Sequence, residues 1–571
     1  MSATPAAAPP VVVVVGAGPV GLTAALLVAD LGIAVSVLER QLAPHPLPRA
    51  VHLDDEVLRV LHRVGVGAAF LARSRPATGL RLLDAERRVL AEFARDTGSG
   101  HTGLGDTGPG DTSRGNTGPG DTGPVNLGLG NTGSSDNGFP FANMFHQPDL
   151  EALLLARVLD HPLIVVLRGA DVVRLERTAG STVVHAVLDG TARAFPAAAV
   201  LGCDGARSTV RDLVGIAMQD LGLTERWLVV DVRSDLPLDT WGGVEQVCDP
   251  VRAATFMRVV GDRYRWEFQL RVGAGDPPEL GRLLRPWTGR DDLEGLEVVR
   301  VATYTYRAAL ARRFGDGDDV FLLGDAAHLT PPFIGQGLGA GIRDAGNLAW
   351  KLADVLALRA PAALLSTYDA ERRPHARALI RKATLVGRAM SSGTGWTARV
   401  RAAGLVTVAR VPALRSAVAS PVSPRLRVHV PRGSVRVRRL LPGSLLPNPR
   451  VCAGDGSIVR LDDVIGGGAA LLVGRAPHPA LLAACRGRGL TVVRLVAARQ
   501  AAEGQVVAGQ VAAARKVAAG QVVAGQGWVE VALVDAPGRL TPLLRNPALC
   551  LQVRPDRVIV GISLGGLPRT R

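Results

Sequence analysis

The stretch Val11-Val12-Val13-Val14-Val15-Gly16-Ala17-Gly18-Pro19-Val20-Gly21 decides the fold of the N-terminal half of the chain. Its five valines predict a buried strand, and the apolar residues that follow predict a helix to about Leu31 and a second strand over 34–38. Glycines at 16, 18 and 21 allow a tight turn and a close approach of the backbone to a ligand. Because such a turn leads into a helix N-terminus, it suits a phosphate group. The stretch therefore predicts a dinucleotide-binding βαβ unit.

Glu39 stands at the end of the second predicted strand, followed by Arg40. A carboxylate in this place accepts hydrogen bonds from both ribose hydroxyls and repels a 2′-phosphate. The site therefore suits FAD or NAD, and not NADP. The glycine pattern alone is a weak signal, and a chance glycine-rich turn is the alternative. The flanking strands and Glu39 strengthen the prediction.

Composition sets the broad class of the protein. Its 571 residues are 47% hydrophobic and 20% charged, which is typical of a globular protein of several domains. The formal net charge is +15, but the arginines are scattered and form no nucleic-acid-binding stripe. Five cysteines without short spacings indicate neither a disulfide framework nor a metal site, so a reducing cytoplasm is expected. Glycines and Asp30 interrupt the apolar stretch 11–38, so we expect no membrane span.

Two low-complexity segments interrupt the chain. The first, 97–138, repeats Asp-Thr-Gly and Asn-Thr-Gly among Pro and Gly, and the second, 501–527, contains GQVVAGQ twice. Both have too little apolar surface to offset their ordering entropy, so we expect disordered insertions. Calcium binding by the first is an alternative, but the strict nonapeptide register is lacking. The runs WLVVDV, ATFMRVV and YRWEFQLRV between Trp227 and Val272 predict an antiparallel sheet, and the Pro-rich stretch 421–449 predicts a domain boundary.

Two further motifs follow predicted strands: Cys203-Asp204-Gly205-Ala206-Arg207-Ser208 and Gly324-Asp325-Ala326-Ala327-His328. Together with the glycine turn they resemble the three signatures of the FAD-dependent aromatic hydroxylases, the flavoprotein monooxygenases of the p-hydroxybenzoate hydroxylase class. Within that class, the runs at 46–66, 146–151 and 331–353 are most similar to the 3-(3-hydroxyphenyl)propionate hydroxylase group. The resemblance covers nearly the whole chain except the two insertions.

The resemblance implies an α/β fold in which a doubly wound FAD-binding domain carries an inserted antiparallel-sheet substrate domain and a C-terminal thioredoxin-like domain. The expected ranges are a disordered tail at 1–10, the FAD-binding domain at 11–215 and 301–420, the substrate sheet at 216–300, and the thioredoxin-like domain at 444–571. That last domain has no Cys-x-x-Cys pair, so we expect a structural role or an association surface, as in a homodimer.

Family positions also imply a set of cofactor-binding residues. They are Gly16, Gly18, Gly21, Glu39, Arg40, Arg49, Gln147, Asp204, Gly205, Arg211, Gly324, Asp325, Gly335 and Gly337. Asp325 is expected at the ribitol, with a helix cap as the alternative. Arg49 is expected at the pyrophosphate and Gln147 beside the flavin, and either could be an ordinary surface residue. Asp204 and Arg211 belong to a motif linked to FAD and to the nicotinamide donor, but Asp204 could only hold a turn.

Catalytic and substrate residues follow from the same comparison. His52 is the candidate base that deprotonates the phenol, with a merely loop-ordering histidine as the alternative, and Pro332 is expected near the reacting atoms. Arg258, Arg265 and Trp266 on the predicted sheet are candidates to meet an acidic aromatic ligand. Gly339 stands where relatives usually have Asn, so we expect a looser flavin loop, and Gly339→Asn is expected to improve coupling.

The resemblance thus implies an FAD monooxygenase that consumes NADH or NADPH and O2. It also implies that a flavin hydroperoxide hydroxylates a small phenol. Phenylpropionate-like and polyketide-like substrates stay open. A flavin reductase or dehydrogenase on the same fold and a non-catalytic FAD-binding protein are the alternatives.

Overall fold

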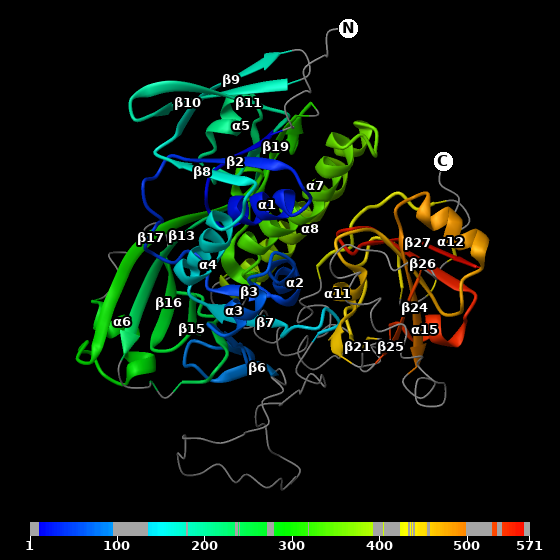
Figure 1. The fold of residues 1–571 in the computed structure, drawn as a ribbon. Coiled ribbons are helices and arrows are strands. Elements are labelled where there is room, and N and C mark those ends of the chain that lie inside the picture. The colour runs from blue at the N-terminus through cyan, green and yellow to red at the C-terminus, as the bar shows by residue number, and fades with distance from the viewer. Residues whose placement is uncertain are drawn as a thin grey trace, which may run out of the picture.

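The computed structural model shows two bodies that pack side by side, a larger one built from the first 391 residues and a smaller C-terminal one (Figure 1). It describes residues 11–94, 135–178, 181–234, 238, 240–270, 279–317, 319–391, 404, 423–431, 434–435, 437, 440–453, 457–497, 528–533 and 539–564. The expected tail at 1–10 and the second insertion lie outside these ranges. Of the first insertion only 135–138 are described.

The valine strand lies inside a six-stranded sheet of order β18-β19-β12-β1-β2-β8. β1 (Val11–Val15) pairs in parallel with β2 (Ala34–Glu39) and with β12 (Ala199–Gly202), and β12 pairs in parallel with β19 (Val320–Leu322). The carboxyl ends of β1, β12 and β19 therefore meet at one edge, and each strand leads into one of the three motifs. The outer strands are β8 (Ile164–Arg168), which is parallel to β2, and β18 (Gly315–Asp316), which is antiparallel to β19.

Two helices cover this sheet at its motif edge. α1 (Pro19–Ala29) begins directly after the glycine turn and is buried on nearly every side, which explains why its residues are apolar all round. α7 (Gly337–Leu356) packs along α1 and is followed by α8 (Ala363–Ser391). Both helix starts therefore lie beside the ends of the parallel strands.

The second sheet has eight strands in the order β20-β17-β13-β16-β15-β14-β5-β6. Its antiparallel centre confirms the expected run of strands. The bounds are β13 (Met218–Ser234), β14 (Val244–Val247), β15 (Ala254–Arg258), β16 (Arg263–Leu270), β17 (Leu296–Ala311) and β20 (His328–Leu329). β5 (Gly79–Leu83) and β6 (Val89–Ala94), which the sequence analysis did not assign to this sheet, extend it through a parallel β14–β5 pair. One face packs on α6 (Leu280–Thr288), through an aromatic core that contains Trp266 and Trp287.

Smaller elements connect the two sheets and surround the first. They are β3 (His52–Asp54), α2 (Asp55–Arg63), α3 (Gly67–Leu71), β4 (Ser74–Pro76), β7 (Ala142–Phe145), α4 (Gln147–Leu159), β9 (Asp171–Thr178), β10 (Ser181–Leu188), β11 (Thr191–Ala197), α5 (Thr209–Leu213), and the 3₁₀ turns η1 (Gly324–Ala326) and η2 (Pro332–Ile334). Among the residues described, no helix combines the length and hydropathy that crossing a bilayer requires.

The C-terminal body has its own core around a seven-stranded sheet of order β22-β21-β25-β24-β23-β26-β27. Its elements are β21 (Arg450–Cys452), β22 (Ile458–Arg460), α11 (Leu461–Ile465), β23 (Ala470–Val473), α12 (Pro479–Arg486), β24 (Thr491–Ala497), β25 (Val529–Leu533), α15 (Thr541–Arg545), β26 (Leu549–Val553) and β27 (Ile559–Leu564). β25, β24 and β23 are parallel, and β26 and β27 run antiparallel to their neighbours.

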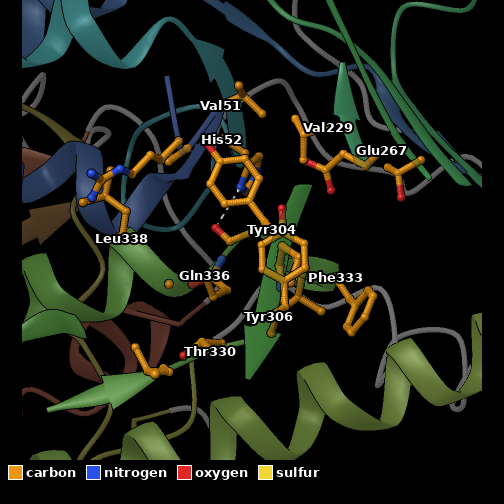
Figure 2. Close-up of a pocket in the computed structure, with 18 of the residues that line it drawn as sticks. Val51, His52, Val229, Glu267, Tyr304, Tyr306, Thr330, Phe333, Gln336 and Leu338 are labelled. Atoms are coloured by element: carbon orange, nitrogen blue, oxygen red, sulfur yellow. Dashed lines mark hydrogen bonds between the residues drawn. The ribbon is translucent and has the colours of Figure 1, made fainter. Parts of the chain in front are cut away.

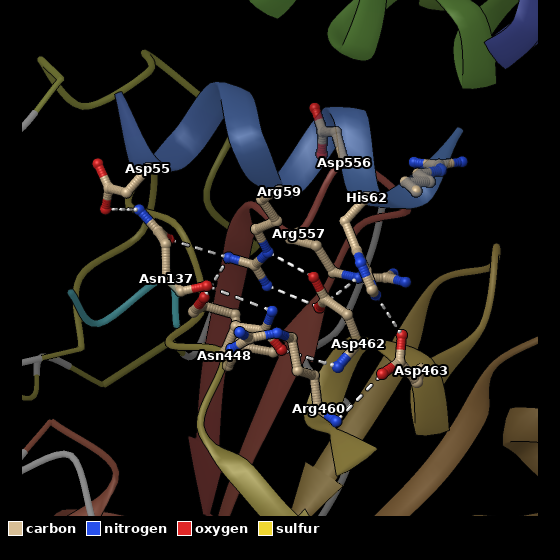
Figure 3. A network of polar contacts seen from close by, with 12 residues as sticks. Asp55, Arg59, His62, Asn137, Asn448, Arg460, Asp462, Asp463, Asp556 and Arg557 are labelled. Carbon is tan, nitrogen blue, oxygen red and sulfur yellow. Dashed lines mark hydrogen bonds and ion pairs between the residues drawn. The ribbon is translucent and has the colours of Figure 1, made fainter. Parts of the chain in front are cut away.

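Buried ion pairs join the two bodies (Figure 3). Asp462 at the start of α11 accepts hydrogen bonds from Arg59 of α2 and from Arg557, and all three side chains are buried or nearly so. A second group joins Glu371 of α8 to Arg554 at 2.6 Å. Asn137, near the end of the first insertion, bonds to Asp55 and to Arg59 in the same interface. The end of the expected insertion is thus held by specific contacts.

Candidate functional site

One cavity of about 1490 Å³ runs from the glycine turn of the first sheet to the open face of the second. Figure 2 shows His52, Gln336 and Leu338 on one side of the cavity, and Glu267 beside Val229 on the side formed by the second sheet. The rings of Tyr304 and Tyr306 lie between them. All three sequence motifs contribute residues to its wall. The first and third motifs lie more than three hundred residues apart in the chain, and together with the second they form one site.

The glycine turn has the shape that a bound phosphate requires. Gly16 has a φ of +104°, and a Cβ there would lie 2.6 Å from the carbonyl oxygen of Cys203. A Cβ on Gly21 would lie 1.9 Å from the carbonyl oxygen of Gly16. Gly18, by contrast, has open space around its missing side chain, lines the cavity, and begins α1 without a side-chain cap. Backbone amides at the start of α1 are thus left for a ligand.

Glu39 supports this turn from behind. Its carboxylate accepts hydrogen bonds from the amide of Ala17 at 2.7 Å and from the amide of Gln41 at 2.8 Å, and the residue does not line the cavity. Arg40, the next residue, does line it. In this structure Glu39 therefore holds the shape of the turn.

Asp325 turns an unpartnered carboxylate toward the cavity. It lines the wall, and it accepts no hydrogen bond from any residue that the structure describes. The helix-cap alternative is not seen, because Leu323 is the N-cap residue of η1. Burial raises the pKa of Asp325, and His328 and Arg49 act in the opposite direction. A neutral ligand with hydroxyl donors would satisfy this group.

A buried network that the sequence analysis missed holds the Gly324–Asp325 turn in place. Asp344 of α7 accepts hydrogen bonds from the amide of Gly324 at 3.1 Å, from His328 at 2.7 Å and from Arg372 of α8 at 2.7 Å. Gly324 itself has a φ of +59°. A signal was present, because Arg343 and Asp344 are adjacent charged residues in a helix whose first half is otherwise mostly glycine, alanine and other apolar residues. Its buried partners lie elsewhere in the chain, so only the fold reveals them.

The second motif is largely occupied with its own turn. Asp204 accepts hydrogen bonds from Ser208 at 2.5 Å and from the amide of Val210 at 3.0 Å, which is the turn-holding alternative. Asp204 and Gly205 line the cavity. Arg211 does not; it donates to the carbonyl oxygen of Ala326 at 3.3 Å and so connects the second motif to the third.

Arg49 and Gln147 lie together on the wall. The amide oxygen of Gln147 accepts hydrogen bonds from the backbone amides of Arg49 at 3.0 Å and Ala50 at 2.6 Å, and its NH2 group donates to Glu151 at 2.7 Å. The amide oxygen of Gln147 therefore positions the loop that carries Arg49, and its nitrogen is bonded to Glu151. The guanidinium of Arg49 has no such anchor among the described side chains and is placed for an anionic ligand.

The Pro332–Gly337 turn faces His52 across the narrow part of the cavity. Nδ1 of His52 lies 3.4 Å from the carbonyl oxygen of Gly335 (Figure 2). Gly335 has a φ of +61°, and a Cβ on it would lie 2.8 Å from the same ring nitrogen. Pro332 and Gly337 also line the cavity, and α7 begins at Gly337. This turn therefore requires glycine at 335 because of both its backbone conformation and its contact with His52.

Gly339 leaves space for Arg343. A Cβ on Gly339 would lie 2.8 Å from a terminal nitrogen of Arg343, and that nitrogen donates to Gln336 at 3.1 Å. Arg343 also pairs with Asp54 and with Glu56, the latter at 2.6 Å. The expectation that Gly339 loosens the flavin loop therefore does not fit this structure, because a buried arginine takes up the space.

Of the three residues expected to meet an acidic ligand, only Arg265 lines the cavity. Its guanidinium pairs with Asp231 at 2.7 Å and donates to the carbonyl oxygens of Pro48 and Arg49. Trp266 is fully buried in the core on the opposite face, because successive residues of β16 point to opposite sides of the sheet. Arg258, at the end of β15, does not line the cavity either. The sheet thus presents a different set of side chains from the one expected.

The side chains that do face the cavity from this sheet include Glu267, Gln246, Thr255, Tyr304 and Tyr306. Burial raises the pKa of Glu267 and that of Tyr306. The two tyrosine rings are stacked, with centroids 6.3 Å apart. Alternation in YRWEFQL showed that either Arg265 and Glu267 or Tyr264 and Trp266 would face one side, but the choice of side required the fold.

These residues fit FAD. The uncapped start of α1 at Gly18 and the guanidinium of Arg49 match a pyrophosphate. The carboxylate of Asp325, which accepts no hydrogen bond from the described residues, matches a chain that bears hydroxyl groups. Among the described residues, no group of three or more His, Cys, Asp or Glu side chains is placed to hold a metal ion.

Comparison with known proteins agrees with this geometry. Residues 10–383 match the FAD binding domain family, and residues 443–569 match the HcaD C-terminal domain family. A 3-(3-hydroxy-phenyl)propionate/3-hydroxycinnamic acid hydroxylase of Mycobacterium sp. (strain JLS) is 35% identical over 482 residues, which are 83% of this chain and 77% of the relative. A probable NADH-specific resorcinol 4-hydroxylase of Rhodococcus jostii (strain RHA1) is 32% identical over 66% of this chain and 65% of its own length.

Solved structures share the fold at lower identity. The anhydrotetracycline hydroxylase OxyS of Streptomyces rimosus superposes with a TM-score of 0.69 at 24% identity, covering 97% of this chain and 95% of its own. An aklavinone-11 hydroxylase in complex with FAD and aklavinone gives a TM-score of 0.70 at 21% identity, covering 98% and 96%. With its matched domain, its relatives and its cavity taken together, this chain belongs to the FAD-dependent aromatic hydroxylases.

Proposed function

We propose that this protein hydroxylates a phenolic ring that lies between the turn of Pro332–Gly337 and the open face of the second sheet. The observation that carries the proposal is the continuity of the cavity, which joins the dinucleotide-type glycine turn to a wall lined with polar and aromatic side chains. The enzyme is an FAD-dependent monooxygenase that consumes NADH or NADPH and O2. When bound, FAD supplies the redox chemistry with the nicotinamide donor and O2 that the side chains themselves lack.

Each part of the cavity then has a proposed binding role. The α1 start with Gly18, together with Arg49, binds the pyrophosphate, and Asp325 accepts hydrogen bonds from the ribitol hydroxyls. Glu39, Gln147 and Asp204 act mainly by holding the backbone that makes these contacts, since their side chains are already bonded. The remaining candidates, Gly205, Arg211, Gly324, Gly335 and Gly337, shape the wall or connect its segments.

His52 is the proposed base for the phenol. It lines the cavity beside Gly335, and a histidine near neutral pH can accept a proton from a hydroxyl group within hydrogen-bond distance. Loss of the phenolic proton makes the ring electron-rich, and the surrounding wall excludes water from it. Pro332 would limit the position of the ring from the opposite side.

The named relatives support a phenolic substrate of small size, since one is named for a hydroxyphenyl-propionate and another for resorcinol. The solved neighbours named for anhydrotetracycline and aklavinone leave a larger fused ring open. We also propose that the C-terminal body is thioredoxin-like, with domain limits near 444–571. Its three parallel strands, its two antiparallel strands and the helix between β23 and β24 support this. A homodimer and a cytoplasmic location stay predictions.

The experiment is NADH and NADPH consumption by the FAD-loaded protein, with and without a panel of phenols, followed by product analysis. We expect a phenol to accelerate consumption and to appear as its hydroxylated product. Equal consumption without phenol and no oxygenated product would instead indicate a reductase. His52→Ala and His52→Gln should lower turnover and remove a limb of its pH profile while FAD content stays unchanged.

A further inference from the structure

Three polar side chains form a row across the sheet side of the cavity. Gln246 of β14 is directly opposite Thr255 of β15, and Thr255 is directly opposite Glu267 of β16. Residues paired in this way lie side by side on one face of a sheet, with Cβ atoms about 5 Å apart. All three line the cavity, although each is less than 9% exposed. They therefore form a continuous polar strip in a deep part of the wall.

This strip offers more hydrogen-bond acceptors than donors, because the hydroxyl of Thr255 is its only donor besides the amide nitrogen of Gln246. The NH2 group of Gln246 donates to the carbonyl oxygen of Phe333 at 3.2 Å, which leaves its amide oxygen without a partner among the described residues. The nearest cation to Glu267 is Arg265, and their closest atoms are 3.9 Å apart, too far for a hydrogen bond. Buried acceptors without donors destabilise a protein. A ligand that brings donors would satisfy them.

The two nearby positive charges, Arg265 and Arg300, are already balanced by two carboxylates, Asp231 and Glu267. Arg265 and Arg300 both pair with Asp231, and Arg300 also donates to the hydroxyl of Tyr304 at 2.9 Å. The cavity's remaining cations outside the glycine-turn side are Arg307, which is exposed, and Lys382, which comes from α8 rather than from the sheet. A carboxylate placed on the strip would therefore meet Glu267, and the only cavity-lining cation of β14, β15 and β16, Arg265, is already paired with Asp231.

We propose that the strip of Gln246, Thr255 and Glu267 selects a neutral aromatic substrate with a second hydroxyl group, and disfavours a ring that carries a carboxylate. This inference rests on the proposed function, which requires only a phenol in the cavity. It assigns the substrate of this chain to the neutral polyphenol class. The hydroxyphenyl-propionate in the name of the most similar relatives reported above carries the disfavoured group.

The test uses ligands matched in ring and chain length. Binding of 3-(3-hydroxyphenyl)propionate and of the corresponding alcohol, 3-(3-hydroxyphenyl)propan-1-ol, is measured by calorimetry on the FAD-loaded protein without NADH. Resorcinol and phenol form a second pair. We expect the alcohol to bind about tenfold more tightly than the acid, because Glu267 repels the carboxylate. We expect resorcinol to bind about tenfold more tightly than phenol, because its second hydroxyl group adds one buried hydrogen bond. Equal or tighter binding of the acid would overturn the proposal.

Variants assign the effect to the strip. Glu267→Gln keeps the size of the side chain and removes its charge, so the preference for alcohol over acid should fall several-fold. Thr255→Val, which removes one hydroxyl, should lower the preference for resorcinol over phenol. Glu297→Gln changes an exposed acid of β17 that lies outside the cavity and should alter neither ratio. Unchanged ratios in both strip variants would overturn the proposal, with FAD content and melting temperature showing that each variant is folded.

Failure of the proposed function gives a different result. If no phenol binds or stimulates NADH consumption, the hydroxylase assignment for this cavity is wrong, and the strip proposal is overturned with it. If the acid is bound and hydroxylated in preference to the alcohol, the hydroxylase assignment holds and only the strip proposal is wrong.

Discussion

At the residue scale, two glycines on α7 differ in whether the missing side chain is required. Gly339 touches the buried guanidinium of Arg343, whereas a Cβ on Gly346 would meet its nearest neighbour, Val60, at an ordinary 3.8 Å. We expect Gly339→Ala to destabilise the protein by about 1–3 kcal/mol, because Arg343 must move away from Gln336 and Asp54. Gly346→Ala should stabilise the helix by about 0.5–1 kcal/mol. Urea unfolding of both variants measures the contrast.

The same contact decides the effect of asparagine at 339. Gly339→Asn should lower FAD retention and product yield per NADH, contrary to the expectation from family comparison, because the larger side chain displaces Arg343. Peroxide released per NADH is the readout. Improved coupling with unchanged FAD content would show that Arg343 can rearrange without harm.

Asp325 allows a test of the cofactor contact that separates binding from folding. Its carboxylate has no hydrogen-bond partner among the described residues, so Asp325→Ala should weaken FAD binding by about 1–3 kcal/mol and leave the melting temperature of the FAD-free protein unchanged or raised. Asp160→Ala, on the exposed end of α4, is the control. Equal FAD affinity in Asp325→Ala and the native protein would refute the assignment.

The sequence predicts which residues lie at the site, but not which of their side chains are free to bind a ligand. Gly18, Arg49 and Asp325 were predicted, and the structure places them on one cavity. Gln147 was also predicted there, but both ends of its amide are bonded to the protein. Such internal bonding depends on neighbours nearly a hundred positions away in the chain, and a sequence motif does not record it.

At the element scale, the start of α2 concentrates negative charge. Asp54 caps the helix and pairs with Arg343, while the adjacent Asp55 is buried and bonded to Asn137. Burial, with the charge of Asp54 added, raises the pKa of Asp55 to about 7. The folded protein therefore binds a proton that the unfolded chain has released between about pH 4 and pH 7.

Stability should accordingly fall as the pH rises through this range. We expect Asp55→Asn, which keeps the contact to Asn137 and removes the charge, to reduce the loss of unfolding free energy between pH 5 and pH 8 by about 1–3 kcal/mol. Asp160→Asn is the exposed control. A native-like pH profile in Asp55→Asn would mean that Asp55 is ionised in the folded protein throughout.

Element prediction succeeded where periodicity was strong and local. The valine strand, α1 and β2 lie within a few residues of their expected places. The attachment of β5 and β6 to the second sheet was not foreseen, because a parallel pairing of β14 with β5 joins segments about 160 residues apart. The face of β16 that meets the cavity could not be chosen for the same reason: the alternation is visible in the sequence, but the register is not.

At the scale of the whole molecule, the two bodies are held together by buried charges (Figure 3). Asp462 neutralises Arg59 and Arg557, and these contacts keep the pKa of its carboxyl well below the usual range, although burial acts in the opposite direction. Asp462→Ala leaves two buried guanidinium groups without the carboxylate that they share and should cost about 3–5 kcal/mol. Asp463→Ala removes a half-exposed pair with His62 and a helix cap and should cost about 1 kcal/mol. Urea unfolding measures the free energy of unfolding of both variants. Equal losses of this free energy would contradict the role of Asp462.

Oxygen transfer requires this cavity to bring FAD and a phenol together. The most direct measurement supplies the FAD-loaded protein with NADH, resorcinol and ¹⁸O₂, and determines the isotope content of the product by mass spectrometry. We expect a new hydroxyl group that carries one ¹⁸O atom and whose formation accompanies NADH consumption. A product without ¹⁸O, or NADH consumption that yields only hydrogen peroxide with every phenol tested, would contradict it.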